Sequence, residues 1–168
     1  MHPLVELAKQ AIEAYITEKK IIKAPEILTS EMKQKAGVFV SLKKHGELRG
    51  CIGTFSPTCG NAAEEIIRNA IEAAASDPRF SPVKKEELND LVISVDVLSE
   101  PLPSPSIKEL DAKRFGIIVK SGHRRGLLLP DLEGVETPED QIEICRRKGG
   151  IGASEPVEIF KFEVRRYK

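Results

Sequence analysis

One short segment of the sequence combines a thiol, a cation and two glycines. Residues 48 to 53 are Leu48-Arg49-Gly50-Cys51-Ile52-Gly53. Side chains of a β-strand alternate between its two faces, so Arg49 and Cys51 are predicted to share one face, about 6 to 7 Å apart. Leu48 and Ile52 would then face the core. A cation at that distance favours the thiolate where the face is partly desolvated, so the segment could supply a cysteine nucleophile beside an anion site.

The same segment also has a purely structural interpretation. Cysteine often packs as a small buried hydrophobe. A glycine within a strand indicates that either another backbone or a ligand comes close, so Gly50 and Gly53 fit both interpretations. The helix predicted to begin near Asn61 would add unpaired amides and a positive dipole end to an anion site.

Other candidate ligand-binding residues occur in two short polar runs. The run Asp77-Pro78-Arg79-Phe80 could hold a helix end through an ion pair, or could close over a site beside Arg49. The basic cluster at residues 123 to 125 could be a solvated turn or a phosphate contact. Cys51 is the candidate nucleophile, and the candidate ligand-binding residues are Arg49, Gly50, Gly53, Asp77, Arg79, His123 and Arg125.

Neither a general base nor a metal site is evident. His45, His123 and Glu47 are the candidate bases, and both histidines are expected in hairpin turns. The histidines are scattered and the cysteines lack zinc-finger spacing, so no metal or cofactor is expected. Cys145 is expected to pack with Ile142 on the buried side of a helix.

Composition narrows the class of protein. The 168 residues contain 26 basic and 26 acidic side chains, which gives no bulk charge to attract nucleic acid or acidic membranes. No apolar stretch approaches the ~20 residues needed to span a bilayer, and the N-terminus is predicted to be a helix rather than a signal peptide. Three cysteines without disulfide-like spacing favour a reducing compartment, so we expect a cytoplasmic protein.

The periodicity of apolar residues predicts an α+β fold with a mainly antiparallel sheet flanked by helices. Helices are predicted over residues 3–20, from 61 to about 76, and from 138 to about 149. Hairpins are predicted over 38–55 and 115–129, and further strands over 93–97 and 160–164. We expect a single domain over residues 1–168, with a possible smaller lobe whose boundary falls at the prolines of 101–105. Gly37 to Ile52 and Gly116 to Leu128 are faintly similar to each other, which two hairpins obeying the same turn rules would also explain.

The run LRGCIG with Thr54-Phe55 closely resembles the hallmark of the AMMECR domain family. Further similar motifs cover nearly the whole chain: GVFV from Gly37, DPRF from Asp77, GLLLP from Gly126 and RKGG from Arg147. The resemblance implies two unequal lobes with a cleft bordered by LRGCIG, in a family without an established activity. It also implies component A of the AmmeMemoRadiSam system, whose partners are a Memo-type, dioxygenase-like protein and a radical S-adenosylmethionine enzyme. Many relatives carry a tryptophan after the position of Pro130, and this chain has none.

Three functions follow as hypotheses. The protein could be an enzyme component that uses Cys51 as nucleophile, with Arg49 and nearby amides holding an anionic group. It could instead bind a small molecule, peptide or partner protein at LRGCIG without catalysis. Nucleic-acid binding or modification ranks last, because the net charge is zero.

Overall fold

The computed structural model describes all 168 residues, which form an α+β protein and confirm the predicted fold class. The chain divides into two compact units. The first comprises Met1–Leu98 together with Arg165–Lys168, and the second comprises Ser99–Val164. None of the helices is long and apolar enough to cross a bilayer.

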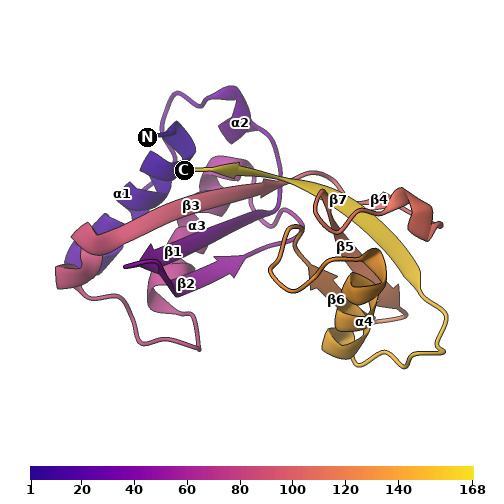
Figure 1. Ribbon diagram of the computed structural model, residues 1–168. Helices are drawn as coiled ribbons and strands as arrows, with labels where there is room; N and C mark the ends of the chain where they lie inside the picture. Colours follow the sequence, from indigo (N-terminus) through magenta and orange to yellow (C-terminus); the bar gives the residue numbers. More distant parts are fainter. The chain divides into compact units, whose positions relative to one another are not determined.

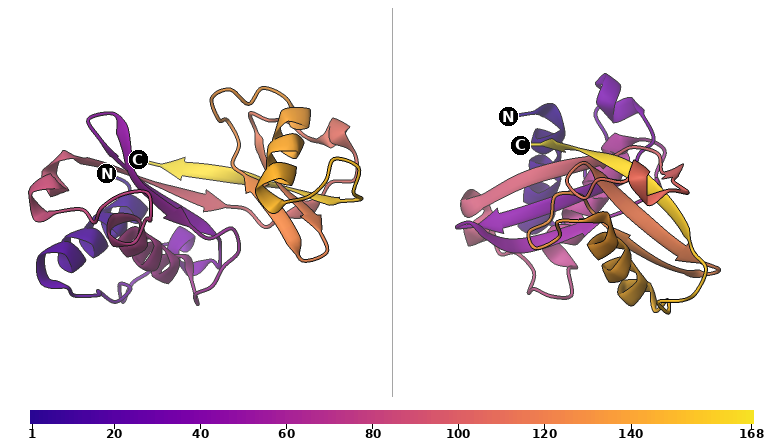
Figure 2. Two further views of the ribbon diagram at one scale, coloured as in Figure 1. Left: turned by 90° about the horizontal axis from the view of Figure 1, so that it is seen from below. Right: turned by 45° about the vertical axis from the view of Figure 1, so that its right-hand side comes forward.

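The first unit is a small antiparallel sheet with helices on one face. Its sheet has the order β2-β1-β3, and the end of β7 lies beside β3. Helices α1 and α3 pack together against the same face (Figures 1 and 2). The buried side chains of Val38, Val40 and Leu42 on β1 fill the space beneath them. The elements of this unit are α1 (Pro3–Glu18), α2 (Ser30–Lys33), β1 (Val38–Lys44), β2 (Glu47–Gly53), α3 (Ala62–Ala75), the 3-10 helix η1 (Lys85–Asp90) and β3 (Leu91–Leu98).

Local sequence explains where these elements begin and end. The β1–β2 hairpin turns at His45 and Gly46, which both have positive φ, as a two-residue hairpin turn requires. The Asn61 side chain accepts a hydrogen bond from the amide of Glu64 and so caps the start of α3. Helix α1 ends two residues before the predicted end, because Lys19 adopts a left-handed conformation.

The second unit has a sheet of order β6-β5-β7, with the short strand β4 beside β7. Helix α4 packs against β5 and β6. The helix begins as predicted, with the Thr137 side chain accepting from the amide of Asp140, and it ends at Gly150, whose φ is positive. The elements are β4 (Leu102–Pro103), the 3-10 helix η2 (Ile107–Glu109), β5 (Phe115–Ser121), β6 (Arg124–Leu128), α4 (Pro138–Gly149) and β7 (Glu158–Tyr167).

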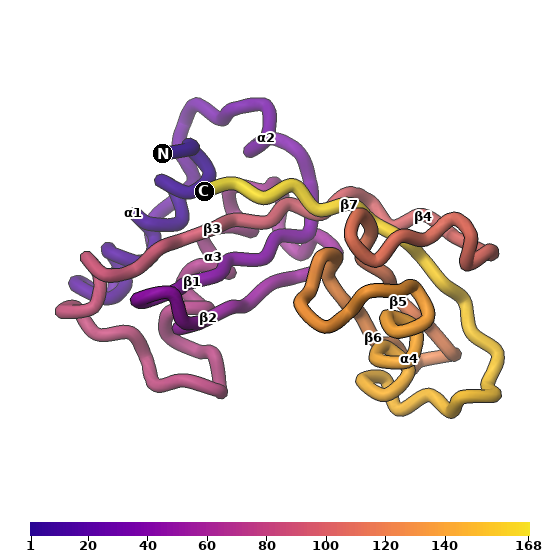
Figure 3. Tube along the Cα trace, viewed as in Figure 1, coloured from indigo at the N-terminus to yellow at the C-terminus, as the bar shows by residue number.

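The two units share one chain topology. Each contains a hairpin, a helix and a returning strand in this order, and in each the first hairpin strand lies between the other two. The tube view allows both paths to be followed by colour, from β1 to β3 and from β5 to β7 (Figure 3). The similarity between Gly37–Ile52 and Gly116–Leu128 in sequence therefore corresponds to the hairpin of each unit.

Candidate functional site

Cys51 lies on β2 directly opposite Ser41 of β1. The Cys51 Sγ and Ser41 Oγ atoms are 3.2 Å apart, and both residues are half-buried. The backbone amide and carbonyl of Cys51 point away from β1, as expected for a pair that exchanges no ladder hydrogen bonds and brings its side chains close. Since Ser41 alternates with the buried Val40 and Leu42, this pair faces away from the helices, on what we call the helix-free face.

The outward backbone groups of Cys51 are held by the segment that follows α3. The Asp77 carboxylate accepts the Cys51 amide at 3.0 Å, and the Arg79 guanidinium donates to the Cys51 carbonyl at 3.2 Å. Arg79 also forms a bidentate ion pair with Asp77, whose side chain is only 2% exposed. The guanidinium of Arg79, against the opposing effect of burial, holds the pKa of Asp77 well below its ordinary value. The predicted Asp77–Arg79 contact thus exists. The same two side chains also provide hydrogen-bond partners for the backbone of Cys51 at the edge of β2.

Arg49 makes a second, separate ion pair. Its Nε and Nη2 atoms donate to the two carboxylate oxygens of Glu87, each at 3.0 Å. Its Nη1 and Nη2 atoms also donate to the carbonyls of Ser81 and Pro82. Four hydrogen bonds therefore occupy a guanidinium that has five donors, and its charge is balanced by Glu87. Lys44 donates to the same carboxylate at 3.0 Å, and together these contacts lower the pKa of Glu87 to about 2.

A β-bulge at Arg49 changes the predicted side-chain directions. Gly50 pairs with Leu42, but Lys43 pairs with Leu48, so β2 has one extra residue, Arg49, at this point. An extra residue reverses the alternation beyond it. Leu48 was expected in the core, and this expectation is wrong: Leu48 is 41% exposed and lies opposite the exposed Lys43. The structure shows no hydrogen bond between the Arg49 guanidinium and the Cys51 thiol, which bonds to Ser41 instead.

The two glycines of the hexapeptide make room for protein atoms. A Cβ on Gly50 would overlap the backbone carbonyl oxygen of Ala73, so the absence of a side chain lets α3 approach β2. A Cβ on Gly53 would overlap the ring of Phe39. Of the two explanations that the sequence left open, close approach of protein atoms is the one present at both positions.

The loop after β2 is fixed by a buried carboxylate that no sequence motif predicts. Glu65 of α3 is fully buried and accepts hydrogen bonds from the backbone amides of Thr58 and Cys59 and from the hydroxyls of Thr54 and Thr58. Although burial opposes ionisation, these donors lower the pKa of Glu65. The one sequence feature that could have predicted this role is the position of Glu65 among the buried residues of α3, where a charged side chain is unusual. Glu87 was equally hidden, because η1 has no apolar periodicity.

The remaining candidates take no part in the hydrogen bonds described above. His123 and Arg125 belong to the β5–β6 hairpin of the second unit. Their neighbour Arg124 pairs with Glu155 at 2.6 Å. His45 is exposed at its turn, 3.9 Å from a carboxylate oxygen of Asp90. Cys145 is buried as expected, and burial raises the pKa of its thiol to about 12.

The surroundings of the Cys51 thiol are known from its hydrogen bond and from those of its backbone. The one polar side-chain partner of the Cys51 thiol is the Ser41 hydroxyl, and the Asp77 carboxylate accepts from the Cys51 backbone. A nucleophile normally has a base within hydrogen-bond reach. No group of three or more His, Cys, Asp or Glu side chains is placed to hold a metal ion. A pocket of about 440 Å³ beside Arg49 is lined by Lys44, Phe80, Ser81, Lys84 and Glu87.

Comparisons with known proteins agree with this architecture. The AMMECR1 family model matches residues 5–167. A protein of Thermotoga maritima is 52% identical over 99% of this chain and 98% of its own length. One from Clostridium acetobutylicum is 53% identical over 99% of the chain, which spans only 36% of that longer relative. The crystal structure of an uncharacterized protein from Pyrococcus horikoshii superposes with a TM-score of 0.87 at 35% identity, covering 97% of this chain and 88% of that one. The chain therefore belongs to the AMMECR1 family.

Proposed function

We propose that this protein is a binding module, and that it holds a small molecule or a peptide on the helix-free face of the first unit, around Ser41 and Cys51. The observation that carries the proposal is the half-buried thiol–hydroxyl pair, whose two atoms are 3.2 Å apart on the neighbouring strands β1 and β2. The outer edge of β2 at Cys51 is already bonded to Asp77. A site on rigid strands holds its polar groups in place before a ligand arrives, which lowers the entropic cost of binding.

Both guanidinium groups near this position are in ion pairs, which favours a ligand group that is held by hydrogen bonds. Arg49 is paired with Glu87, and Arg79 is paired with Asp77, so neither guanidinium offers an unbalanced charge to an anion. The pair Ser41 and Cys51 can both donate and accept hydrogen bonds. The exposed side chains of Leu48 and Val92 offer apolar contact nearby. Both residues lie opposite Lys43, which is two residues from Ser41 on β1 and therefore on the same face of the sheet.

A fragment screen monitored by amide NMR tests the proposal. We expect hits that shift the signals of Ser41, Cys51 and Gly53 together and lose affinity about tenfold in Ser41→Ala, the loss of one or two hydrogen bonds. The control Cys59→Ala removes another half-buried thiol of the same unit and should leave binding unchanged. Absence of hits at these residues, with hits elsewhere, would contradict the proposal.

Alkylation with iodoacetamide separates binding from nucleophilic catalysis. A binding role expects Cys51 and Cys59 to react at similar rates across pH, with Cys145 protected. Selective alkylation of Cys51 at low pH would instead favour the enzyme hypothesis, in which Cys51 attacks a substrate.

We also propose that partner proteins use this module, as the family resemblance suggests for a Memo-type, dioxygenase-like protein and a radical S-adenosylmethionine enzyme. The longer Clostridium relative supports a role for this module beside other domains, since this chain corresponds to only 36% of that protein. Titration calorimetry with each purified partner tests this. Binding that is weakened by Leu48→Asp would support the same face, and absence of binding to both would count against the proposal.

A further inference from the structure

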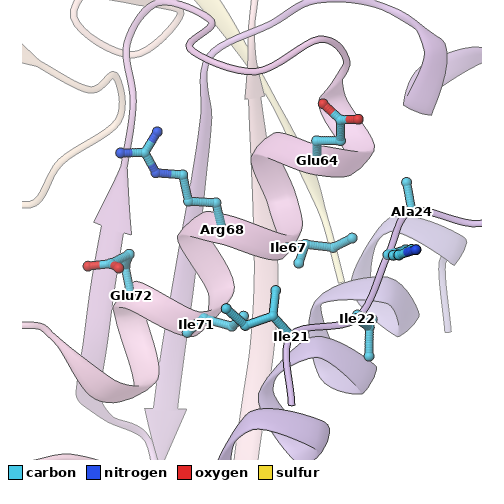
Figure 4. Close-up of a pocket in the computed structure, with 9 residues that line it drawn as sticks. Ile21, Ile22, Ala24, Glu64, Ile67, Arg68, Ile71 and Glu72 are labelled. Carbon is cyan, nitrogen blue, oxygen red and sulfur yellow. The ribbon is translucent and has the colours of Figure 1, made fainter. Parts of the chain in front are cut away.

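A groove in the first unit, formed by residues other than those of the hexapeptide, lies between α3 and the segment that follows α1 (Figure 4). Its volume is about 520 Å³, within the range of ligand-binding pockets. Ile67 and Ile71 of α3 point toward Ile21 and Ile22 across the groove (Figure 4). Branched aliphatic side chains on both walls favour an aliphatic group of similar shape.

The segment that forms one wall is strand-like but has no strand partner. From Ile21 to Ala24 the residues alternate between exposed and half-buried, as in an extended strand. The last backbone bonds at the end of α1 come from the amides of Lys19 and Lys20. From residue 21 to residue 28, no backbone amide or carbonyl has a hydrogen-bond partner within the chain. Such an edge can accept a further strand.

The charges at the rim give the groove a polarity. The side chains of Glu72 on α3 and Lys23 on the opposite wall make no hydrogen bond or ion pair. Glu64 and Arg68, the other two charged lining residues, both belong to α3 and have neutral hydrogen-bond partners, the amide of Gly60 and the hydroxyl of Thr58. The α3 side carries two acidic groups and one basic group, so the net charge at the rim is negative on the helix side and positive on the side of Lys23.

We propose that this groove binds an extended peptide segment of another protein, which pairs its backbone with Ile21–Ala24 and inserts aliphatic side chains beside Ile67 and Ile71. The peptide carries a basic residue that pairs with Glu72 and an acidic residue that pairs with Lys23. Main-chain hydrogen bonds supply affinity in this mode, and the alternate side chains that enter the groove supply specificity. Ile21, which is 68% exposed in the free protein, becomes covered.

Selection from a library of displayed random peptides tests the proposal with the full chain as bait. We expect enriched sequences with alternating aliphatic residues and both charges. Their affinity should fall about tenfold or more in Ile21→Asp and in Glu72→Lys, since each change removes about 1.4 kcal/mol or more of binding. Both positions are on the surface, and circular dichroism checks that the variants fold.

The matched control is Ile27→Asp. Ile27 is 89% exposed in the same irregular segment but does not line the groove, so this variant should bind the selected peptides like the unchanged protein. Hydrogen exchange provides a second readout, because strand addition should protect amides between Ile21 and Ala24.

Several results would overturn the proposal. These are failure to enrich any sequence, equal binding by Ile21→Asp, or binding without protection of the segment's amides. Binding of decanoate in the groove without amide protection would show a site for a lipid-like molecule instead. Self-association that is abolished by Ile21→Asp would show that a second copy of this chain covers the groove.

Discussion

At the scale of single residues, the charged groups of the hexapeptide region act mainly on the protein itself. Arg49 connects β2 to the loop before η1 through Glu87 and the carbonyls of Ser81 and Pro82. A bidentate arginine–carboxylate pair has fixed geometry as well as charge, so a lysine at position 49 could not make the same set of contacts. The role of Arg49 is therefore to position the segment that follows α3.

The carboxylate of Glu87 makes a measurable contribution to the pH dependence of folding. Because its pKa falls from 4.5 to about 2 in the folded protein, the stabilisation is complete above pH 4.5 and is lost as the pH falls toward 2. The shift corresponds to about 3 kcal/mol at most, and partial solvent exposure reduces this figure. We expect Glu87→Gln to lower the free energy of unfolding at pH 7 by about 1 to 3 kcal/mol, and by much less at pH 2.

Urea denaturation at several pH values measures this effect. Glu86→Gln is the matched control, since Glu86 is exposed on the same 3-10 helix. An equal loss of stability at pH 2 and pH 7 would mean that the carboxylate charge is not what stabilises the fold.

At the scale of elements, a glycine in the second hairpin strand sets the distance between helix and strand in both units. A Cβ on Gly50 would overlap the carbonyl oxygen of Ala73 in α3, and a Cβ on Gly126 would overlap that of Cys145 in α4. The two positions correspond in the shared topology. The residue after each is also held at its carbonyl, Cys51 by Arg79 and Leu127 by Lys148 at 2.7 Å. The glycines therefore belong to the packing of helix on hairpin.

We expect Gly50→Ala and Gly126→Ala each to destabilise the protein by about 3 kcal/mol or more. A helix backbone cannot rotate out of the way as a side chain can, so the added methyl group must displace the helix. Thermal unfolding followed by circular dichroism measures the loss.

Gly152→Ala is the control for these substitutions. Its Cβ would meet only the flexible side chain of Glu155, at 3.4 Å. We expect a change below about 1 kcal/mol there. Wild-type stability in Gly50→Ala would show that α3 can move away from β2 at little cost.

At the scale of the whole molecule, the last strand belongs to both units. Residues up to Val164 of β7 lie in the second unit, whereas Arg165–Lys168 lie in the first. Arg166 forms a bidentate pair with Asp96 of β3, with both hydrogen bonds at 2.7 Å. The Asp96 side chain is almost fully buried, so the first unit depends on a residue that follows the second unit in the chain.

Removing the partner of a buried carboxylate leaves an uncompensated charge. We expect Arg166→Ala to lower the free energy of unfolding by about 2 kcal/mol, and the double variant with Asp96→Asn to recover part of the loss, because a neutral amide is less costly to bury. Urea denaturation of the single and double variants measures both values.

Arg165→Ala serves as the control, because Arg165 is exposed and makes no ion pair. Equal stability of Arg166→Ala and the unchanged protein would show that Asp96 is satisfied without its partner.

Sequence patterns determined the elements because their causes are local. The Asn61 and Thr137 caps, the His45-Gly46 turn and the glycine end of α4 are set by contacts within a few residues. Apolar alternation located β1, β3 and β7, and the α+β class followed from the order of elements. The Asp77–Arg79 pair could also be anticipated, since its members are two residues apart.

Only the tertiary structure decided what the hexapeptide residues contact. Arg49 is paired with Glu87, which is 38 residues away in the chain, and Cys51 is bonded through its backbone to Asp77, 26 residues away. The bulge at Arg49 exposes Leu48, and no pattern of residue types marks such a register shift. Strand alternation assumes an unbroken ladder, and pairings of distant residues depend on how elements pack. The sequence alone could therefore locate the segment but not assign its partners.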